Sequence, residues 1–383
     1  MAGSAWRNRW HWRGKSVKRA VLALEDGVWY EGRSFGAERG AEGEVVFCTS
    51  MTGYQEIVTD PSYCGQMVVL TYPLIGIYGV NAADAQSRNP WAEALIVRDY
   101  YDDHSNWRSE GSLHSYLSAN GIPGLCGIDT RALTRHLRTQ GTMRAVLACE
   151  PGIPPEELVK RAKEVQPLSE KSLVDSVTVR EPYTVPPAPE TGTSVRLAVV
   201  DCGTKASIVR WLARKGAEVA VLPADATAAD VLALRPAGVV FSNGPGDPAS
   251  LPEVVATLTD LLATDLPVLG ICLGHQMLGL AVGGRTSRLK FGHHGGNHPV
   301  RDLVDGRVYI TSQNHEFQVE AASVDATSGY FISHLNLNDG SVEGIAHRSR
   351  PVFSVQFHPE ASPGPEDNLC TFDRFLAACR RDV

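Results

Sequence analysis

A cysteine flanked by glycines is the residue best suited to chemistry in this sequence. Cys272 lies in a G-x-C-x-G pattern, after the apolar run 266–269 and before a helix expected at 277–282. At such a strand-to-helix turn, small neighbours let the backbone turn sharply and leave the sulfur exposed. The helix N-terminus favours the thiolate over the thiol, and the N–H of Leu273 can point at an oxyanion. Taken alone, the pattern also fits a buried structural cysteine.

The candidate base for this cysteine is His358, which ends an apolar strand and is followed by Pro359 and Glu360. Residues two apart in an extended chain project to the same side, and Pro359 biases His358 away from helical geometry. The carboxylate of Glu360 could fix the tautomer of His358 and stabilise its imidazolium, while the other ring nitrogen takes the thiol proton. Cys272, His358 and Glu360 thus supply a nucleophile, a base and an orienting group.

Alternating strands and helices in the second half of the chain are expected to position these residues. Strands separated by helices of this length predict a mostly parallel sheet covered by helices, and sites in such sheets lie beyond the carboxyl ends of the strands. Cys272 falls at such an end, as does the loop 242–248, whose glycines let backbone N–H groups approach a ligand; alone, this loop fits a tight turn. We expect strands at 195–200, 218–222, 238–241 and before Cys272, and helices at 205–215, 228–234 and 251–263.

The first half of the chain is mixed and strand-rich. The Asp-Gly turn at 26–27 predicts a hairpin, and further apolar runs predict strands at 44–47, 66–71 and 94–97 and an amphipathic helix at 130–139. Four prolines between residues 181 and 194 predict an extended linker. We therefore divide this α/β chain into an N-terminal extension at 1–18, a strand-rich domain at 19–180, the linker at 181–194 and a second domain at 195–383.

The first nineteen residues interleave tryptophans with arginine and lysine. A membrane-surface arm, an RNA-binding arm and a transit peptide all fit this composition. We favour a short disordered extension, with translation beginning near Val17. Deleting residues 1–16 should then leave activity and assembly intact.

The composition argues against several classes of protein. A net charge of −7 and a pI near 6.0 do not fit a general nucleic-acid binder. No apolar stretch reaches the length of a membrane span. The 8 cysteines are scattered over 383 residues without a C-x-x-C pair. This usage favours free thiols in a reducing cytoplasm over a disulfide scaffold or a zinc site.

Several motifs together resemble a known family. GICLGHQ at 270–276, NGPGDP at 243–248 and HPE at 358–360 are similar to the class I (triad) glutamine amidotransferases. The match extends to the small, glutamine-hydrolysing subunit of carbamoyl-phosphate synthase through TGYQE at 52–56, DPSY at 60–63, GIDTR at 127–131, FGHHGGNHP at 291–299 and EASPGP at 360–365. The resemblance covers the chain from about Lys18 onward, and the strand-rich first domain narrows it to this subunit.

The resemblance implies hydrolysis of glutamine through a thioester. Cys272 would attack the side-chain amide, and His358 would pass the proton to the leaving amine and then activate water. The N–H groups of Leu273 and Gly244 would form the oxyanion hole. The positions implied to bind glutamine are Ser62, Gly244, Gly246, Leu273, Gln276, Asn314, Glu316 and Phe317.

Released ammonia needs an acceptor site, because ammonia in neutral water is mostly protonated and no longer nucleophilic. The chain has no P-loop or other convincing nucleotide motif, so we expect no cofactor in this chain. The resemblance names the partner as a large subunit that uses ATP and Mg to make carbamoyl phosphate from bicarbonate, for arginine and pyrimidine biosynthesis. It implies a cytoplasmic ligase assembled as a heterodimer or larger hetero-oligomer, with no nucleic-acid or membrane partner.

Glu316 departs from the pattern of the family, in which glycine is common at this position. A backbone contact with the side chain pointing to solvent would be tolerated, whereas a positive φ would strain a glutamate. We expect the backbone contact. Replacing Glu316 by glycine should then leave the Michaelis constant for glutamine nearly unchanged.

Three histidines, His293, His294 and His298, invite comparison with a metal site because imidazole is a common ligand. Their spacing matches no ordinary zinc pattern, and no cysteine or carboxylate lies among them in the sequence. We therefore expect no metal. This loop should pack near the active site or the partner subunit.

Two alternatives of other classes remain open. The chain could serve a different synthase, such as anthranilate or aminodeoxychorismate synthase, but those subunits are usually a lone α/β domain. It could also be a catalytically silent docking subunit, against which the intact set of Cys272, His358 and Glu360 argues. Labelling of Cys272 by a glutamine-like reagent would discriminate between a silent subunit and an active one.

Overall fold

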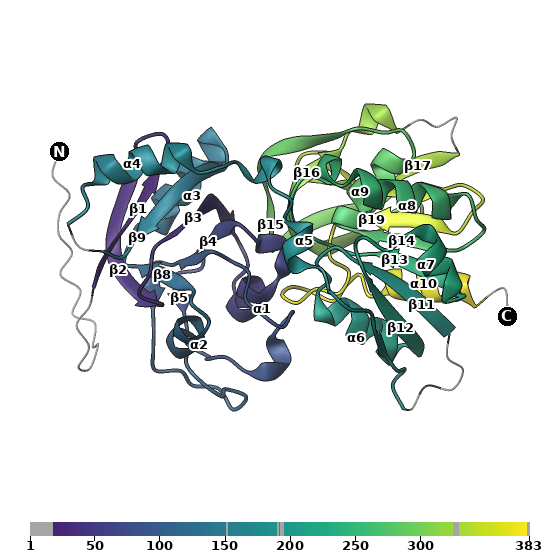
Figure 1. Ribbon diagram of the computed structural model, residues 1–383, viewed down its shortest axis with the longest axis horizontal. Helices are drawn as coiled ribbons and strands as arrows, with labels where there is room; N and C mark the ends of the chain where they lie inside the picture. The colour runs from purple at the N-terminus through teal and green to yellow at the C-terminus, as the bar shows by residue number, and fades with distance from the viewer. Residues whose placement is uncertain (1–17, 151, 190, 192–194, 325–328, 381–383) are drawn as a thin grey trace.

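The computed structural model describes residues 18–150, 152–189, 191, 195–324 and 329–380. Two bodies lie side by side in Figure 1, a strand-rich body in purple and blue and a larger sheet covered by helices in teal to yellow. Apart from Lys18, the predicted N-terminal extension lies outside the described residues. Among the helices that are described, none has both the length and the apolar character needed to cross a membrane.

The first body is a closed barrel with the strand order β1-β2-β8-β6-β4-β3-β9. The predicted hairpin is confirmed, because β1 and β2 pair antiparallel on either side of the Asp-Gly turn. The parallel pair β3 and β4 needs a longer connection, which contains α1. The barrel strands are β1 (Arg19–Leu24), β2 (Trp29–Gly36), β3 (Ala41–Cys48), β4 (Gln66–Leu70), β6 (Ala94–Ile96), β8 (Pro123–Cys126) and β9 (Met143–Ala148), flanked by β5 (Leu74–Ile75), β7 (Asp99–Tyr100), α1 (Tyr54–Thr59), α2 (Leu113–Ala119), α3 (Thr130–Gln140) and α4 (Pro155–Glu164).

Both faces of β3 are buried over most of its length. Val45 of β3 packs in a core that includes Leu133 and Leu137 of α3. The next residue, Val46, packs on the opposite face with Ile57 of α1, as the two-residue repeat of a strand requires. The predicted amphipathic helix is therefore present as α3, with leucines four residues apart turned into a core.

The second body is built on one sheet with the order β10-β12-β11-β13-β14-β19-β18-β17-β15-β16. Its central strands β12, β11, β13, β14 and β19 are parallel neighbours, as predicted for strands joined by helices. Antiparallel strands that were not predicted continue the sheet on both sides. On one side β10 pairs with β12; on the other, β15 with β16 and β17 with β18 follow each other through short connections. The strands are β10 (Tyr183–Val185), β11 (Val195–Asp201), β12 (Ala217–Pro223), β13 (Gly238–Phe241), β14 (Val268–Ile271), β15 (Thr286–Asp302), β16 (Val308–Val319), β17 (Tyr330–Asn336), β18 (Val342–His347) and β19 (Val352–Val355).

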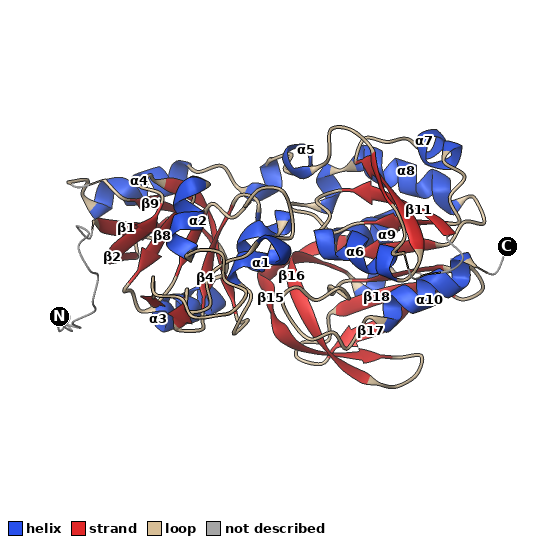
Figure 2. Ribbon diagram, turned by 90° about the horizontal axis from the view of Figure 1, so that it is seen from below, coloured by secondary structure: helices blue, strands red, loops and turns tan. Residues whose placement is uncertain are grey.

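Helices cover both faces of this sheet (Figure 2). On one face Val239 packs in a core with Met277 of α9, and on the other Val240 packs with Ile208 of α6 and Phe375 of α10. Burial on both faces explains why these strands are almost continuously apolar. The helices are α5 (Val174–Val177), α6 (Ala206–Arg214), α7 (Ala228–Ala233), α8 (Pro252–Leu262), α9 (Leu273–Ala281) and α10 (Cys370–Cys379).

Part of the segment predicted as a linker belongs to the sheet. Residues Tyr183–Val185 form β10, which pairs antiparallel with β12. Upstream of the segment, Val174 and Val179 already pack in the cores of the second body. The predicted limits of the domains stay a prediction, but the chain joins the second body before residue 181.

The long hairpin of β15 and β16 brings the second body against the barrel (Figure 2). The rings of Phe291 on β15 and Phe47 on β3 stack with centroids 5.7 Å apart. The backbone N–H of Thr49 donates to the carbonyl oxygen of His294 at 3.0 Å. Residues of the barrel can therefore reach the carboxyl edge of the parallel strands.

Candidate active site

Cys272 lies at the junction of β14 and α9, as predicted. Its φ of 54° and ψ of −103° are unusual for a residue other than glycine. A Cβ at Gly274 would lie 2.1 Å from the carbonyl oxygen of Phe241, so only glycine fits there. The sharp turn holds the sulfur beside β16, where the thiol donates to the carbonyl oxygen of Asn314 at 3.5 Å.

Burial controls the protonation of this thiol. Cys272 is 1% exposed, and burial, together with the charges of Asp60 and Glu360, holds its pKa well above the ordinary range. The N–H of Leu273, directed at the sulfur, and the charge of Lys205 lower the pKa, but by less. The helix terminus favours the thiolate, as expected, but desolvation outweighs it. The thiol must lose its proton to a base as it reacts.

His358 and Glu360 follow β19, the strand that neighbours β14 in the sheet. Nδ1 of His358 lies 2.6 Å from Oε1 of Glu360. Within the described part of the chain, Nε2 of His358 has no hydrogen-bond partner. The N–H of His358 donates to the carbonyl oxygen of Ser312 at 2.9 Å, which fixes the backbone. The structure thus brings Cys272 and the histidine–glutamate pair to one edge of the sheet.

A buried lysine that the sequence analysis missed completes this edge. Nζ of Lys205, at the start of α6, lies 2.9 Å from Oε1 of Glu360, and their side chains are 2% and 0% exposed. Burial raises the pKa of Glu360, but the charges of Lys205 and His358 lower it to about 2 overall. Glu360 is therefore a carboxylate that can stabilise an imidazolium at His358. The one signal in the sequence was a lysine between a strand and a helix, at the edge where sites form.

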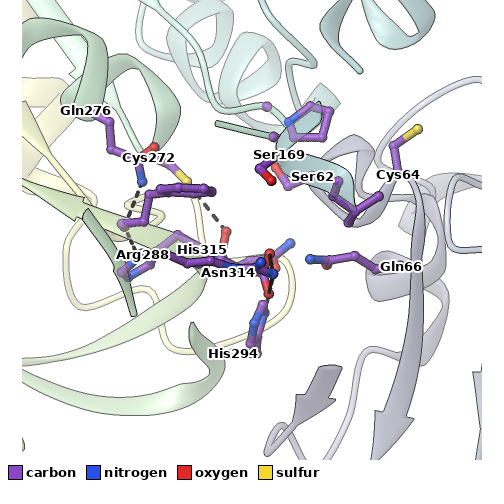
Figure 3. Close-up of a pocket in the computed structure, with 16 residues that line it drawn as sticks. Ser62, Cys64, Gln66, Ser169, Cys272, Gln276, Arg288, His294, Asn314 and His315 are labelled. Carbon is purple, nitrogen blue, oxygen red and sulfur yellow. Dashed lines mark hydrogen bonds and ion pairs between the residues drawn. The ribbon is translucent and has the colours of Figure 1, made fainter. Parts of the chain in front are cut away.

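A pocket opens beside Cys272. In Figure 3, Ser62 and Gln66 of the first body lie on the opposite side of the pocket from Cys272 of the second body. All the predicted glutamine-binding residues except Leu273 line this pocket: Ser62, Gly244, Gly246, Gln276, Asn314, Glu316 and Phe317. The pocket therefore gathers these residues, while their contacts with glutamine stay a prediction.

Asp60 connects the barrel to the groups around the sulfur. Its carboxylate accepts hydrogen bonds from Nδ2 of Asn314 and from the N–H of Ser62, both at 2.9 Å. Nδ2 of Asn243 donates to Oγ of Ser62 at 3.0 Å. Asp60, in the first body, therefore orients Asn314, whose carbonyl oxygen accepts the hydrogen bond from the thiol of Cys272. The DPSY motif marked the region but not this contact, whose partners are 254 residues apart.

Glu316 does not point to solvent, contrary to expectation. It is 9% exposed, lies in β16 and is not among the residues with positive φ, so its backbone is unstrained. Nη2 of Arg288 lies 3.2 and 3.1 Å from its two carboxylate oxygens and also pairs with Glu44 of the barrel. Burial and the charge of Glu44 raise the pKa of Glu316, while the charge of Arg288 lowers it; the resulting pKa is about 7. The side chain is part of a charged cluster in the pocket wall.

The histidine-rich loop is part of β15 and packs at the site, as expected. His294 lines the pocket, and its Nδ1 lies 2.9 Å from Oδ1 of Asn314. His293 lies 2.9 Å from Asp339 and 3.8 Å from Glu343. No carboxylate lies among these histidines in the sequence, but in the folded chain two carboxylates lie close to His293.

His293, His315 and Glu343 place ligand-type atoms within 4.8 Å of one another. The two oxygens of Glu343 already accept amide hydrogens, from Asn336 at 2.8 Å and from Gln313 at 2.9 Å. Nε2 of His315 also lies 3.0 Å from Oε1 of Gln313. The group fits a hydrogen-bonded cluster, and the lack of a metal stays a prediction.

Comparisons with known proteins match nearly the whole chain. It is 50% identical over 366 residues to the carbamoyl phosphate synthase small chain of Symbiobacterium thermophilum, which covers 94% of this chain and 98% of that protein. It is equally identical to the protein of the same name from Methanopyrus kandleri, over 94% of this chain and 99% of that one. A carbamoyl phosphate synthase pyrimidine-specific small chain of Halalkalibacterium halodurans is 49% identical over 94% and 96% of the two chains.

Family models match each body separately. Residues 198–378 match glutamine amidotransferase class-I, so the second body is a domain of that class. Residues 22–147 match the CPSase domain of the carbamoyl-phosphate synthase small chain. The chain belongs to the carbamoyl-phosphate synthase small chain family. The resemblance inferred from the sequence motifs and the predicted α/β fold class are confirmed.

Proposed function

We propose that this chain is the glutamine-hydrolysing subunit of carbamoyl-phosphate synthase, with Cys272, His358 and Glu360 as its catalytic residues. The observation that carries the proposal is their convergence at one sheet edge beside a pocket. There the strained turn presents the sulfur, and Nε2 of His358 has no protein partner in the described residues. Lys205 keeps Glu360 ionised.

In the first half-reaction, the sulfur of Cys272 bonds to the side-chain carbonyl carbon of glutamine. The thiol proton passes to Nε2 of His358, whose Nδ1–H is held by Glu360. The N–H groups of Leu273 and Gly244 stabilise the oxyanion. The imidazolium then protonates the amide nitrogen, the carbon–nitrogen bond breaks, and ammonia leaves a glutamyl thioester.

In the second half-reaction, water replaces ammonia. His358 takes a proton from water, which attacks the thioester carbonyl and releases glutamate. The proton returns to the sulfur of Cys272. Because burial raises the pKa of this thiol, the site returns to a neutral cysteine rather than a stored thiolate.

The proposal includes a partner that consumes the ammonia. The relatives named small chains support a complex with a large subunit, which would use ATP and Mg to make carbamoyl phosphate from bicarbonate. This chain would then need no cofactor of its own. We place the complex in the cytoplasm, serving arginine and pyrimidine biosynthesis; one relative is named a pyrimidine-specific small chain.

Covalent labelling tests whether the cysteine is active. A chloroketone analogue of glutamine should modify Cys272 alone, as mapped by mass spectrometry, and glutamine should slow the labelling. Iodoacetamide, which should modify the exposed Cys370, is the control for general thiol reactivity. Failure of the analogue to label Cys272 while Cys370 still reacts would favour the silent docking subunit.

A further inference from the structure

Two buried carboxylates share one guanidinium in the wall of the pocket. Glu316 on β16 and Glu44 on β3 both pair with Nη2 of Arg288 on β15. Nη2 also donates to the hydroxyl of Thr142 at 3.1 Å, and Glu44 accepts the N–H of Leu168 at 3.1 Å. With both carboxylates ionised, the cluster carries one negative charge in excess.

The excess charge faces the space proposed for glutamine. Arg288 and Glu316 line the pocket together with His294 and His315, whose pKa values are lowered by burial so that both rings are neutral. Glutamine brings an α-ammonium group and an α-carboxylate into this space. A buried charge is costly unless it is paired and hydrogen-bonded, and an ammonium has three hydrogens to donate.

We propose that the side-chain carboxylate of Glu316 binds the α-ammonium group of glutamine. The inference rests on the proposed function, since the pocket must accept glutamine. The ammonium of the bound substrate would complete a local cluster of two cations and two carboxylates with Arg288, Glu316 and Glu44, while the α-carboxylate of glutamine must bind elsewhere in the pocket. The earlier expectation for Glu316→Gly is revised: the Michaelis constant for glutamine should rise, because the partner of the ammonium is lost.

Protonation of Glu316 gives this contact a pH dependence. The groups facing its carboxylate are the guanidinium of Arg288 from β15, the carboxylate of Glu44 from β3 and the hydroxyl of Thr142 before β9. Burial raises the pKa of Glu316 to about 7. Below that pH the free site carries a proton that the ammonium must displace. The preference of the site for substrates that carry an α-amino group should therefore weaken as the pH falls through 7.

A comparison of two amides tests the contact. Glutaric acid monoamide has the side-chain amide and the carboxylate of glutamine but lacks the α-amino group. We would measure kcat and KM for both amides with the full chain, with and without a large subunit, in wild type and Glu316→Gln. The control is Glu320→Gln, which neutralises a carboxylate paired with Arg285 at 3.0 Å in an exposed ion pair.

The contact predicts a change in the preference of the enzyme for glutamine over the monoamide. Wild type should prefer glutamine in kcat/KM, and Glu316→Gln should lose on the order of tenfold of this preference, as expected for a charged hydrogen bond. The loss should come from KM for glutamine, with the monoamide unchanged and Glu320→Gln like wild type. Glu44→Gln should also reduce the preference, because Arg288 then pairs with Glu316 alone; this variant carries the test if Glu316→Gln does not fold.

Three outcomes would overturn the inference. An equal loss for both amides would show that Glu316 only supports the pocket wall. An unchanged preference in the folded variants would show that the ammonium binds elsewhere. If wild type hydrolyses neither amide, the proposed function fails, and the inference with it.

Discussion

Two buried carboxylates on different sides of the active site have opposite acidities. The pKa of Glu360 is lowered to about 2, because Lys205 and His358 outweigh the effect of burial. The pKa of Glu316 is raised to about 7, because burial outweighs the guanidinium of Arg288, which Glu316 shares with Glu44. The difference shows that the number of cations per carboxylate, rather than burial alone, sets the charge.

The comparison separates two roles within one site. Glu360 has a lysine to itself and stays a fixed anion that orients His358. Within the described part of the chain, Glu316 shares its one paired cation, Arg288, with Glu44, so its environment favours an incoming cation. The charge of the proposed catalytic carboxylate is thus balanced by the protein before substrate arrives, whereas the charge of the proposed binding carboxylate would be balanced by the substrate.

The largest effect on stability is expected from removing the cation beside Glu360. Lys205→Met leaves the buried carboxylate of Glu360 with only His358 beside it, which should cost about 3–5 kcal/mol in the free energy of unfolding and reduce kcat. Urea unfolding and glutaminase kinetics would measure both. Lys215→Met, which breaks an exposed pair with Asp373, should cost less than about 1 kcal/mol. Equal losses in the two variants would contradict the assignment of Lys205.

Glu360→Gln should lose stability in a pH-dependent way. The folded pKa of Glu360 is below its usual value, so the wild-type carboxylate stabilises the fold above about pH 4.5 and loses this contribution as the pH falls towards 2. The deficit of the variant, on the order of 3 kcal/mol near pH 7, should therefore shrink in acid. Urea midpoints across this range measure it, and a deficit independent of pH would point to lost packing instead.

Glu316→Gln should show the opposite trend with a smaller net effect. The raised pKa of Glu316 means that wild type loses stability as the pH rises from about 4.5 through 7, because the unfolded chain ionises first. The neutral variant avoids this loss, so its stability relative to wild type should improve over that interval. Parallel urea titrations at pH 4.5 and 8 test the sign. A relative decline of the variant would contradict the comparison.

Removing metal ions should have the smallest effect, and the quantity measured is the rate of glutamine hydrolysis. Dialysis of the chain against a chelator should leave glutamine hydrolysis intact, because amide hydrogens already satisfy Glu343 in the histidine cluster. The assay is glutaminase activity before and after dialysis. Loss of activity that zinc restores would show that His293 and His315 hold a metal.

Features that depend on residues close together in the sequence could be predicted. The turn at Cys272 needs only glycines a few residues away, and His358 and Glu360 are two residues apart, so short patterns were enough to find them. The hairpin at Asp26-Gly27 and helix α3 were found for the same reason. The parallel centre of the sheet followed from the alternation of strands and helices.

Contacts between distant segments could not be predicted in this way. Arg288 and Glu44 are 244 residues apart, and Nζ of Lys205 also reaches the carbonyl oxygen of Ala361, 156 residues further along the chain. The net acidity of Cys272 could not be predicted, because the motif shows the helix terminus but not the burial around the sulfur. The direction of the Glu316 side chain likewise depends on the barrel that packs against β16.

Changing the nitrogen donor tests most directly the proposal that this chain hydrolyses glutamine and its partner makes carbamoyl phosphate. Carbamoyl phosphate formation from bicarbonate and ATP would be measured with a large subunit and either wild type or Cys272→Ala, using glutamine or ammonia. The variant should lose the glutamine-dependent reaction and keep the ammonia-dependent one. A wild-type chain that supports product formation from ammonia but never from glutamine would contradict the account.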